Sequence, residues 1–257
     1  MFDKVTRTWN PCIIYPCYFN CVYCWTRYFI EKKLLNSPAG KLYKQYYGKP
    51  TLIEDRLRVR FKKGEIVFTQ DVGDLFAPNV PDEYILKVLD VIRKNPQADF
   101  LLLTKNPSRV FDILCRYSPF DPFQENVIFG VTVETDNDEL YKRFQISRAP
   151  PPGQRLCAFS GVLWLADAHV ARVRAWISIE PIIDFSNPRK FAEAIITSTD
   201  CVDEVIVYVG YDNYNVLRKY KIPEPPLHKT LELIDILKQH GIEVRTKTLR
   251  KAWNEQT

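Results

Sequence analysis

Six short apolar runs, separated by stretches of helical spacing, constrain this chain more than any other feature. The runs are rich in Val, Ile and Phe and cover 65–68, 100–103, 127–133, 175–179, 204–209 and 242–244. Apolar residues recur at helical spacing between them, as in the stripes that begin at Tyr84 and Leu227, and 155–170 is a further predicted helix. Strands that alternate with helices predict parallel pairing through right-handed crossovers. An open doubly wound sheet and a barrel both satisfy this pattern.

The carboxyl ends of the predicted strands share a chemical property. Each of the six runs is followed by a charged side chain: Asp71, Lys105, Glu134, Glu180, Asp212 and Lys247. In α/β barrels the active site lies at that face, because the strand-to-helix loops converge there. The alternative is that polar residues only mark where each strand stops. The shared property favours an α/β fold built as a partial (β/α)6 TIM-like barrel with parallel strands, open on one side.

Three cysteines form the most specific motif. Cys17, Cys21 and Cys24 have the spacing Cys-x3-Cys-x2-Cys, which seven cysteines in 257 residues are not expected to produce by chance. Three thiolates in one short loop can bind three irons of a [4Fe–4S] cluster. The fourth iron would then lack a protein ligand and could bind a small chelating molecule.

Two other metal centres remain open for this motif. A structural zinc site also uses cysteines at short spacing, but zinc ribbons generally have two separated Cys-x2-Cys pairs, and this chain has no second pair. Cys12 could serve as a fourth cluster ligand in an electron-transfer centre. We instead expect Cys12 to be an ordinary residue at the end of the first strand.

Composition bounds the location and the partners. No apolar run reaches the ~18 residues of a membrane span, so no membrane partner is expected. The first ten residues, MFDKVTRTWN, lack the layout of a signal peptide, which favours the cytoplasm. The net charge of +5 is compatible with a polyanionic partner and equally with an ordinary soluble surface.

The cysteine spacing, together with Tyr23 just before the third cysteine, resembles the radical S-adenosylmethionine (SAM) enzymes. The segments FTQDVGDLF, LLLTKNPSRV, FGVTVET and WISIEPIID follow in the order of the spore photoproduct lyase-like branch. They are most similar to its three-cysteine members from phages and mobile elements. The resemblance implies one radical SAM barrel domain over 1–257, a [4Fe–4S] cluster on Cys17, Cys21 and Cys24, and SAM as a second cofactor. It further implies a flavodoxin- or ferredoxin-like reductant and formation of a 5′-deoxyadenosyl radical.

The resemblance also assigns roles in SAM binding. Where the family has a Gly-Gly-Glu-Pro-type segment for the SAM amino group, this chain has Thr69, Gln70 and Asp71. Lys105 is the expected partner of the SAM carboxylate, and Glu134 that of the ribose hydroxyls. The full set of expected cofactor-binding residues is Tyr23, Thr69, Gln70, Asp71, Thr104, Lys105, Thr132, Glu134 and Arg143. Arg143 is included because its planar guanidinium suits a carboxylate.

Three further residues are candidates for contact with the substrate. Glu180 lies at a strand end, where a carboxylate must be paired or functional because burying it alone is costly. It could pair with Lys247 or Arg245. Tyr208 and Tyr211 follow at the next strand end and complete the set of catalytic candidates.

Two basic segments suggest a substrate class. An excursion at about 36–63 mixes Lys and Arg with Tyr and Phe, and 245–253 adds further bases. Basic groups neutralise phosphates and aromatic rings stack on unpaired bases, so a nucleic acid or nucleotide is the leading expectation. A peptide or protein is the second, and a small metabolite the third. A non-catalytic Fe–S or zinc module that recognises nucleic acid is the alternative from another class.

Overall fold

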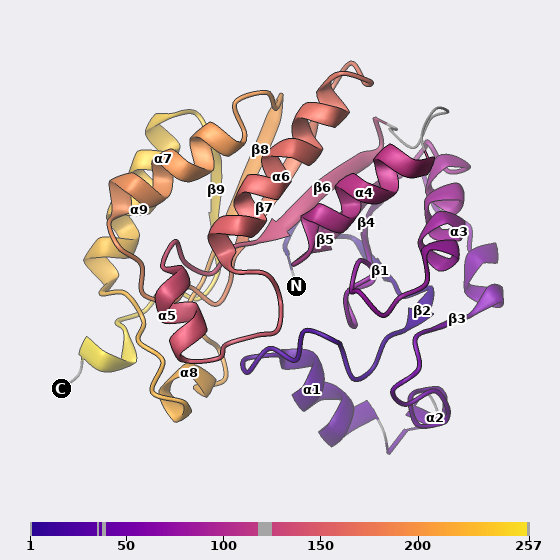
Figure 1. Ribbon diagram of the computed structural model, residues 1–257, viewed down its shortest axis with the longest axis horizontal. Coiled ribbons are helices and arrows are strands. Elements are labelled where there is room, and N and C mark those ends of the chain that lie inside the picture. The colour runs from indigo at the N-terminus through magenta and orange to yellow at the C-terminus, as the bar shows by residue number, and fades with distance from the viewer. Residues whose placement is uncertain (1, 35, 38–39, 118–124, 256–257) are drawn as a thin grey trace.

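A parallel sheet forms the centre of the computed structural model, which describes residues 2–34, 36–37, 40–117 and 125–255 (Figure 1). Its strands, in spatial order, are β1 (Arg7–Trp9), β4 (Ile66–Thr69), β5 (Asp99–Thr104), β6 (Val127–Thr132), β7 (Arg174–Ile179), β8 (Glu204–Val209) and β9 (Glu243–Thr246). Every neighbouring pair is parallel. β1 and β9 are the edges, so the barrel is not closed.

The predicted α/β fold with an open parallel sheet is confirmed. All six apolar runs are strands, with ends shifted by a few residues. The sheet has seven strands, one more than the six of the predicted barrel. The strand without an apolar run, β1, reads Arg-Thr-Trp and ends three residues before Cys12, where the first strand was expected to end. An edge strand of this length buries too little to need an apolar run.

Helices cover the outer face of the sheet. The long ones are α3 (Asp82–Arg93), α4 (Pro107–Tyr117), α6 (Pro152–Asp167), α7 (Pro188–Ser198) and α9 (Leu227–Gln239). The helix predicted at 155–170 is α6, which begins and ends three residues before the predicted bounds. It begins at Pro152 because proline fits the first turn of a helix. Gly241 follows α9 with a φ of +79°, a backbone conformation that favours glycine and ends the helix.

Successive side chains of the strands β4 to β8 enter two different hydrophobic clusters. In β5, Phe100 and Leu102 pack under the helices, whereas Leu101 faces the inside of the open barrel. The inner cluster is completed by Phe2 and Val5, which reach it from before β1. Burial on both faces explains why the central strands read as continuous apolar runs.

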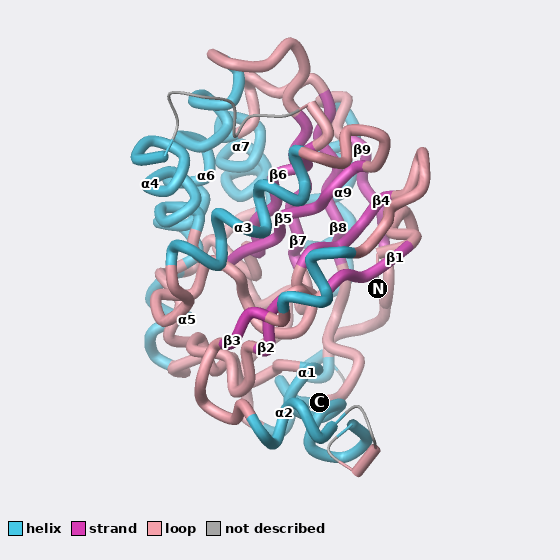
Figure 2. Tube along the Cα trace, turned by 90° about the vertical axis from the view of Figure 1, so that its right-hand side faces the viewer, coloured by secondary structure: helices cyan, strands magenta, loops and turns pink. Residues whose placement is uncertain are grey.

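The segment between β1 and β4 forms a separate layer at one end of the sheet (Figure 2). It contains the antiparallel pair β2 (Cys12–Ile13) and β3 (Thr51–Leu52), the helices α1 (Trp25–Phe29) and α2 (Gly40–Gln45), the π-helix Ile30–Leu34 and the 3-10 helix Glu54–Arg58. Cys12 thus opens a strand of this small sheet instead of ending the first strand as predicted. Residues 38 and 39 of the predicted excursion lie outside the described residues.

Three short helices complete the described chain: α5 (Asp138–Arg143), α8 (Val216–Lys219) and the 3-10 helix Trp253–Glu255. None of the helices in the described residues combines the length and hydropathy needed to cross a membrane.

Candidate functional site

The cysteine loop connects β2 to α1 and is held from both sides. Within it, the Asn20 amide donates to the Cys17 carbonyl and the Cys24 amide to the Cys21 carbonyl, both over 3.2 Å. The chain after α5 braces the loop, since the Val22 amide donates to the Ile146 carbonyl over 2.9 Å. The Cys21 thiol also donates to the Ser147 hydroxyl over 3.2 Å. The loop is therefore a fixed part of the fold.

The three thiols occupy one electrostatic neighbourhood. Cys21 is buried, while Cys17 and Cys24 are partly exposed. Burial, then the charge of Asp74, and then the two other thiols raise the pKa of Cys17 to about 12. Burial also raises the pKa of Cys21, against the opposing charge of Lys105. Among the described residues no three His, Cys, Asp or Glu side chains are arranged to hold a single metal ion. The donor set, three thiols from one loop, fits a cluster that takes one thiolate on each of three irons.

Glu134 is the hub of a buried polar group beside these thiols. It follows β6, is fully buried, and accepts from Arg155 Nη2 over 2.7 Å and from Lys105 Nζ over 3.0 Å. The Tyr23 hydroxyl donates to the same oxygen as Lys105. Burial alone would raise the pKa of Glu134, but Arg155 and Lys105 hold it at about 2. The structure thus brings together Tyr23, Lys105 and Glu134, three of the expected cofactor-binding residues.

Asp74 joins this group from the loop after β4. Its carboxylate is buried and accepts from the Thr104 hydroxyl over 2.8 Å and from the Lys105 amide over 2.9 Å. A third bond comes from the Phe76 amide over 2.9 Å. Burial raises the pKa of Asp74, which these donors oppose. Asp74 therefore fixes the backbone of Lys105 while its charge acts on Cys17.

Gln70 and Asp71, expected in place of the family's Gly-Gly-Glu-Pro segment, form hydrogen bonds with residues at and just before β2. Gln70 has a φ of +61°, and its amide binds the Cys12 backbone at both N–H and C=O over 3.1 Å. Asp71 accepts from Asn10 over 2.5 Å. The buried Thr69 hydroxyl has no hydrogen-bond partner among the described residues. Of the two aspartates in this loop, Asp74 faces the cysteine loop and Asp71 faces the start of β2.

Arg155, which the sequence did not single out, contacts Glu134, whereas Arg143, expected at the SAM carboxylate, lies at the surface. Arg143 lies on α5 with its guanidinium exposed and stacked 5.6 Å from its neighbour Phe144. Arg155 is fully buried on α6 and also donates to the carbonyl of Thr132. A signal for Arg155 exists in the sequence, since it occupies the same buried stripe as Phe159 and Val162. A charge on such a stripe indicates a buried partner.

The predicted pairing of Glu180 is made by Lys247. Lys247 Nζ lies 2.8 Å from Glu180 Oε2, and the backbone of Gly210 leaves room for the carboxylate. Arg245 pairs instead with Asp3 and Glu243. The same Asp3 accepts from the Tyr208 hydroxyl over 3.0 Å. Glu180 and Tyr208 therefore lie inside the open barrel, each already bound to a neighbour.

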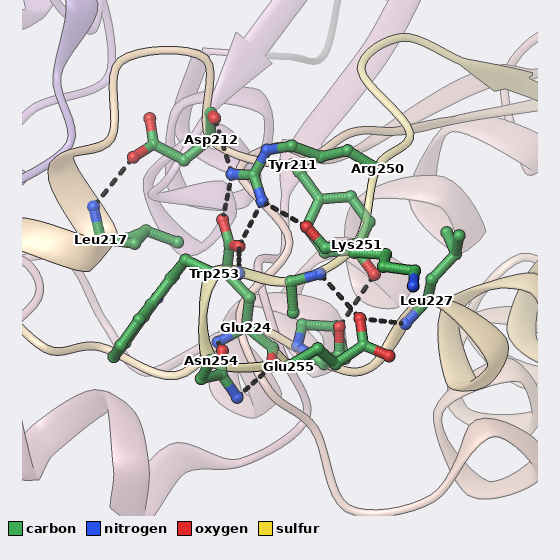
Figure 3. A network of polar contacts seen from close by, with 12 residues as sticks. Tyr211, Asp212, Leu217, Glu224, Leu227, Arg250, Lys251, Trp253, Asn254 and Glu255 are labelled. Atoms are coloured by element: carbon green, nitrogen blue, oxygen red, sulfur yellow. Dashed lines mark hydrogen bonds and ion pairs between the residues drawn. The ribbon is translucent and has the colours of Figure 1, made fainter. Parts of the chain in front are cut away.

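Tyr211 belongs to a structural network that anchors the C-terminal segment (Figure 3). Its hydroxyl donates to the Pro225 carbonyl over 2.8 Å and contacts the Thr230 hydroxyl over 2.8 Å. The Asp212 carboxylate accepts from the Leu217 amide over 2.8 Å. The hydroxyl of Tyr211 is therefore used within the fold, whereas the sequence made Tyr211 a candidate for contact with the substrate.

Several side chains of the two basic segments are buried or ion-paired, so fewer of them are free to contact a nucleic acid than the sequence suggested. In the excursion at 36–63, Tyr43 and Phe61 are buried, and Tyr46 packs against the hydrophobic cluster that contains Tyr43. In 245–253, Arg250 is paired with the fully buried Glu224. Tyr47 is the exposed aromatic residue of the described excursion, with 61% of its surface accessible.

Comparison with known proteins identifies a family and a fold. Residues 3–186 match the family model "Protein of unknown function (DUF5131)". No curated protein sequence matches the chain. A cysteine-to-alanine variant of spore photoproduct lyase with dinucleoside spore photoproduct is similar, with a TM-score of 0.57 at 11% identity over 90% of this chain and 74% of that one. Spore photoproduct lyase complexed with dinucleoside spore photoproduct gives 0.54 at 10% identity over 90% and 74%. At these identities the likeness establishes the fold.

Proposed function

The chain belongs to the DUF5131 family of proteins of unknown function, and we propose that it is a radical SAM enzyme whose substrate is a nucleic acid or nucleotide. One observation carries the proposal. Cys17, Cys21 and Cys24 lie in one electrostatic neighbourhood with the polar group of Glu134, Lys105 and Tyr23, at one end of an open parallel sheet. The fold shared with spore photoproduct lyase supports the same assignment.

The three cysteines would hold a [4Fe–4S] cluster, and SAM would bind beside it. When bound, the cluster would supply the electron that cleaves SAM to a 5′-deoxyadenosyl radical. The electron would come from a flavodoxin- or ferredoxin-like reductant. Tyr23 belongs to the cysteine loop and its hydroxyl contacts Glu134, so its ring would form part of the wall against the adenine.

Lys105 is the residue we assign to the SAM carboxylate. Its ammonium has three donors, of which Glu134 takes one, so two remain for a ligand. Glu134 already accepts from Arg155, Lys105 and Tyr23, and a carboxylate has about four lone-pair sites, so about one remains for a ribose hydroxyl. Glu134 therefore acts mainly by positioning Lys105 and Tyr23.

The decisive experiment is anaerobic reconstitution with iron and sulfide, followed by reduction with dithionite in the presence of SAM. We expect one cluster per chain and formation of 5′-deoxyadenosine. Both should be lost when Cys17, Cys21 or Cys24 is changed to Ala, and both should persist in Cys157→Ala, a control at an exposed cysteine of α6. A cluster without SAM binding would instead favour a non-catalytic Fe–S module. Zinc without iron would favour the structural alternative.

A second experiment tests the residue assignments. Lys105→Ala should keep the iron content and lose most SAM binding in equilibrium dialysis, because the ammonium contributes a charge-assisted contact. Unchanged SAM affinity in Lys105→Ala would remove this residue from the proposed site. With a peptide as the substrate, the same SAM cleavage would be stimulated by peptides and not by oligonucleotides.

A further inference from the structure

A row of exposed tyrosines runs along the face that carries the cysteine loop. Tyr28 lies on α1, Tyr214 in the loop before α8, and Tyr220 directly after α8, with 46%, 54% and 46% of their surfaces accessible. The rings of Tyr28 and Tyr214 lie 5.8 Å apart at an angle of 31°. Figure 1 shows α1 and α8 along the same lower edge of the molecule. Two segments distant in sequence thus build one aromatic surface.

Cations accompany these rings. Lys32 Nζ lies 4.6 Å from the centre of the Tyr28 ring, and Lys219 Nζ lies 5.7 Å from that of Tyr220. Within the part of the chain that the structure describes, neither lysine makes an ion pair, and the same holds for Lys33, Arg218 and Lys221. The bases at 245–250 differ, since Arg245, Lys247 and Arg250 each have an acidic partner. Unpaired positive charge therefore gathers beside the tyrosines.

The row ends at a pocket of about 490 Å³ between α5 and the C-terminal segment. Its apolar wall includes Phe144 and Trp253, and Arg143 and Lys221 supply positive charge. The acid of the lining, Glu139, is paired with Lys142. The Trp253 indole is fixed, because its N–H donates to the Ile222 carbonyl over 2.9 Å. A flat apolar wall with two cations suits a planar base that carries a phosphate.

The surface is connected to the candidate site through a small hydrophobic cluster. Tyr141 of α5, Leu217 of α8 and Ile222 are buried in it, and Val22 and Tyr23 of the cysteine loop pack against it. A ligand on α8 and α5 would therefore lie on the elements that support Tyr23.

We propose that this surface, the tyrosines 28, 214 and 220 with the pocket of Phe144 and Trp253, binds unpaired nucleic acid; the proposal rests on the function proposed above. Exposed ring faces stack on unpaired bases, whereas a duplex hides its bases from them. The unpaired cations complement the phosphates. An acidic peptide would use the cations and leave the ring faces unused.

Binding of a fluorescently labelled single-stranded oligonucleotide to the reconstituted protein, followed by anisotropy, tests the surface. We expect the Kd to rise at least about tenfold when Tyr214→Ala and Tyr220→Ala are combined, since each stacked ring contributes to affinity. Combining Lys219→Ala with Lys221→Ala should make the slope of log Kd against log salt concentration smaller by about 1.4. That is the value for two phosphate contacts on a single strand, about 0.7 for each contact. Trp164→Ala is the matched control, because Trp164 is 56% exposed on α6. It should leave the Kd within about twofold.

Three outcomes would contradict the proposed binding surface. They are tighter binding of duplex than of single strand, tighter binding of an acidic peptide, or a larger loss of affinity in Tyr47→Ala than in the combined Tyr214→Ala and Tyr220→Ala variant. The wild-type protein separates this proposal from the proposed function. If it forms 5′-deoxyadenosine without binding the oligonucleotide, the surface is wrong. If it binds the oligonucleotide and the tyrosine pair is required, the surface stands even where SAM is not cleaved.

Discussion

Arg155 donates from Nη2 to Oε2 of Glu134 over 2.7 Å, and neither side chain is exposed to solvent. A charge buried in this way needs a partner of opposite sign, because desolvation is expensive. Lys105 is the second cation on the same carboxylate, and it is partly accessible. The group therefore carries one cation that is locked inside the fold and one that a ligand can reach.

Arg155→Met should destabilise the protein strongly. It leaves Glu134 buried with Lys105 as its remaining charged partner, and breaking such a pair typically costs about 3–5 kcal/mol. Urea unfolding of the apo protein measures the change in the free energy of unfolding. Lys94→Ala is the control, because it breaks an exposed pair with Asp90 and should cost about 1 kcal/mol or less. Equal losses in the two variants would contradict a buried ion pair.

Lowering the pH should lower the free energy of unfolding of the wild-type protein, because Glu134 takes up a proton. The folded pKa of about 2 lies below the ordinary value of 4.5, so the unfolded chain takes up the proton first as the pH falls. The stabilisation from this carboxylate is therefore complete above about pH 4.5 and is lost as the pH falls toward about 2. Glu134→Gln should flatten this dependence. Urea midpoints of both proteins across this range measure it, and parallel curves would show that another group is responsible.

The chain's sequence anticipates the part of the fold that is buried on both faces. The strands β5 to β8 need apolar residues on both faces, so each reads as a continuous run, whereas the edge strand β1 leaves no such pattern. Lys105 and Glu134 were also predictable as neighbours. They follow adjacent parallel strands, β5 and β6, whose ends share one edge of the sheet.

Other features depend on backbone geometry or on packing between distant segments. Gln70 turns toward Cys12 because its φ is positive, and a non-glycine residue gives little sign of that in sequence. The aspartate whose charge acts on Cys17 is Asp74, whereas Asp71 binds Asn10. Arg155 meets Glu134 only once α6 packs on β6, so the arginine on the buried stripe could be noticed but its partner could not be named.

Gly73→Ala should disturb the approach to the cysteine loop. Gly73 has a φ of +93°, and an added Cβ would lie 2.6 Å from the carbonyl oxygen of Ile14. Backbone strain and the clash together should cost about 3 kcal/mol or more in urea unfolding. Gly48→Ala is the matched control, with a φ of +75° and no atom within 4 Å of the new Cβ. It should cost only the strain, about 1–2 kcal/mol. Similar losses would mean that Ile14 moves aside freely.

Arg250→Ala should release the C-terminal segment that Figure 3 shows tied to the loop after β8. Arg250 donates to both oxygens of Glu224 over 2.6 and 2.7 Å and to the Asp212 carbonyl over 2.9 Å. Glu224 is fully buried, so losing these donors should cost about 2–3 kcal/mol locally.

Limited proteolysis and hydrogen exchange would detect this release as faster cleavage and faster exchange in 248–255. Lys251→Ala is the control, because Lys251 is an exposed neighbour. Trp253 forms a wall of the pocket proposed for a base, and its amide donates to Glu224 over 3.0 Å. Arg250→Ala should therefore also weaken oligonucleotide binding, although Arg250 is not among the residues that line the pocket. Wild-type protection of 248–255 in this variant would show that other contacts hold the segment.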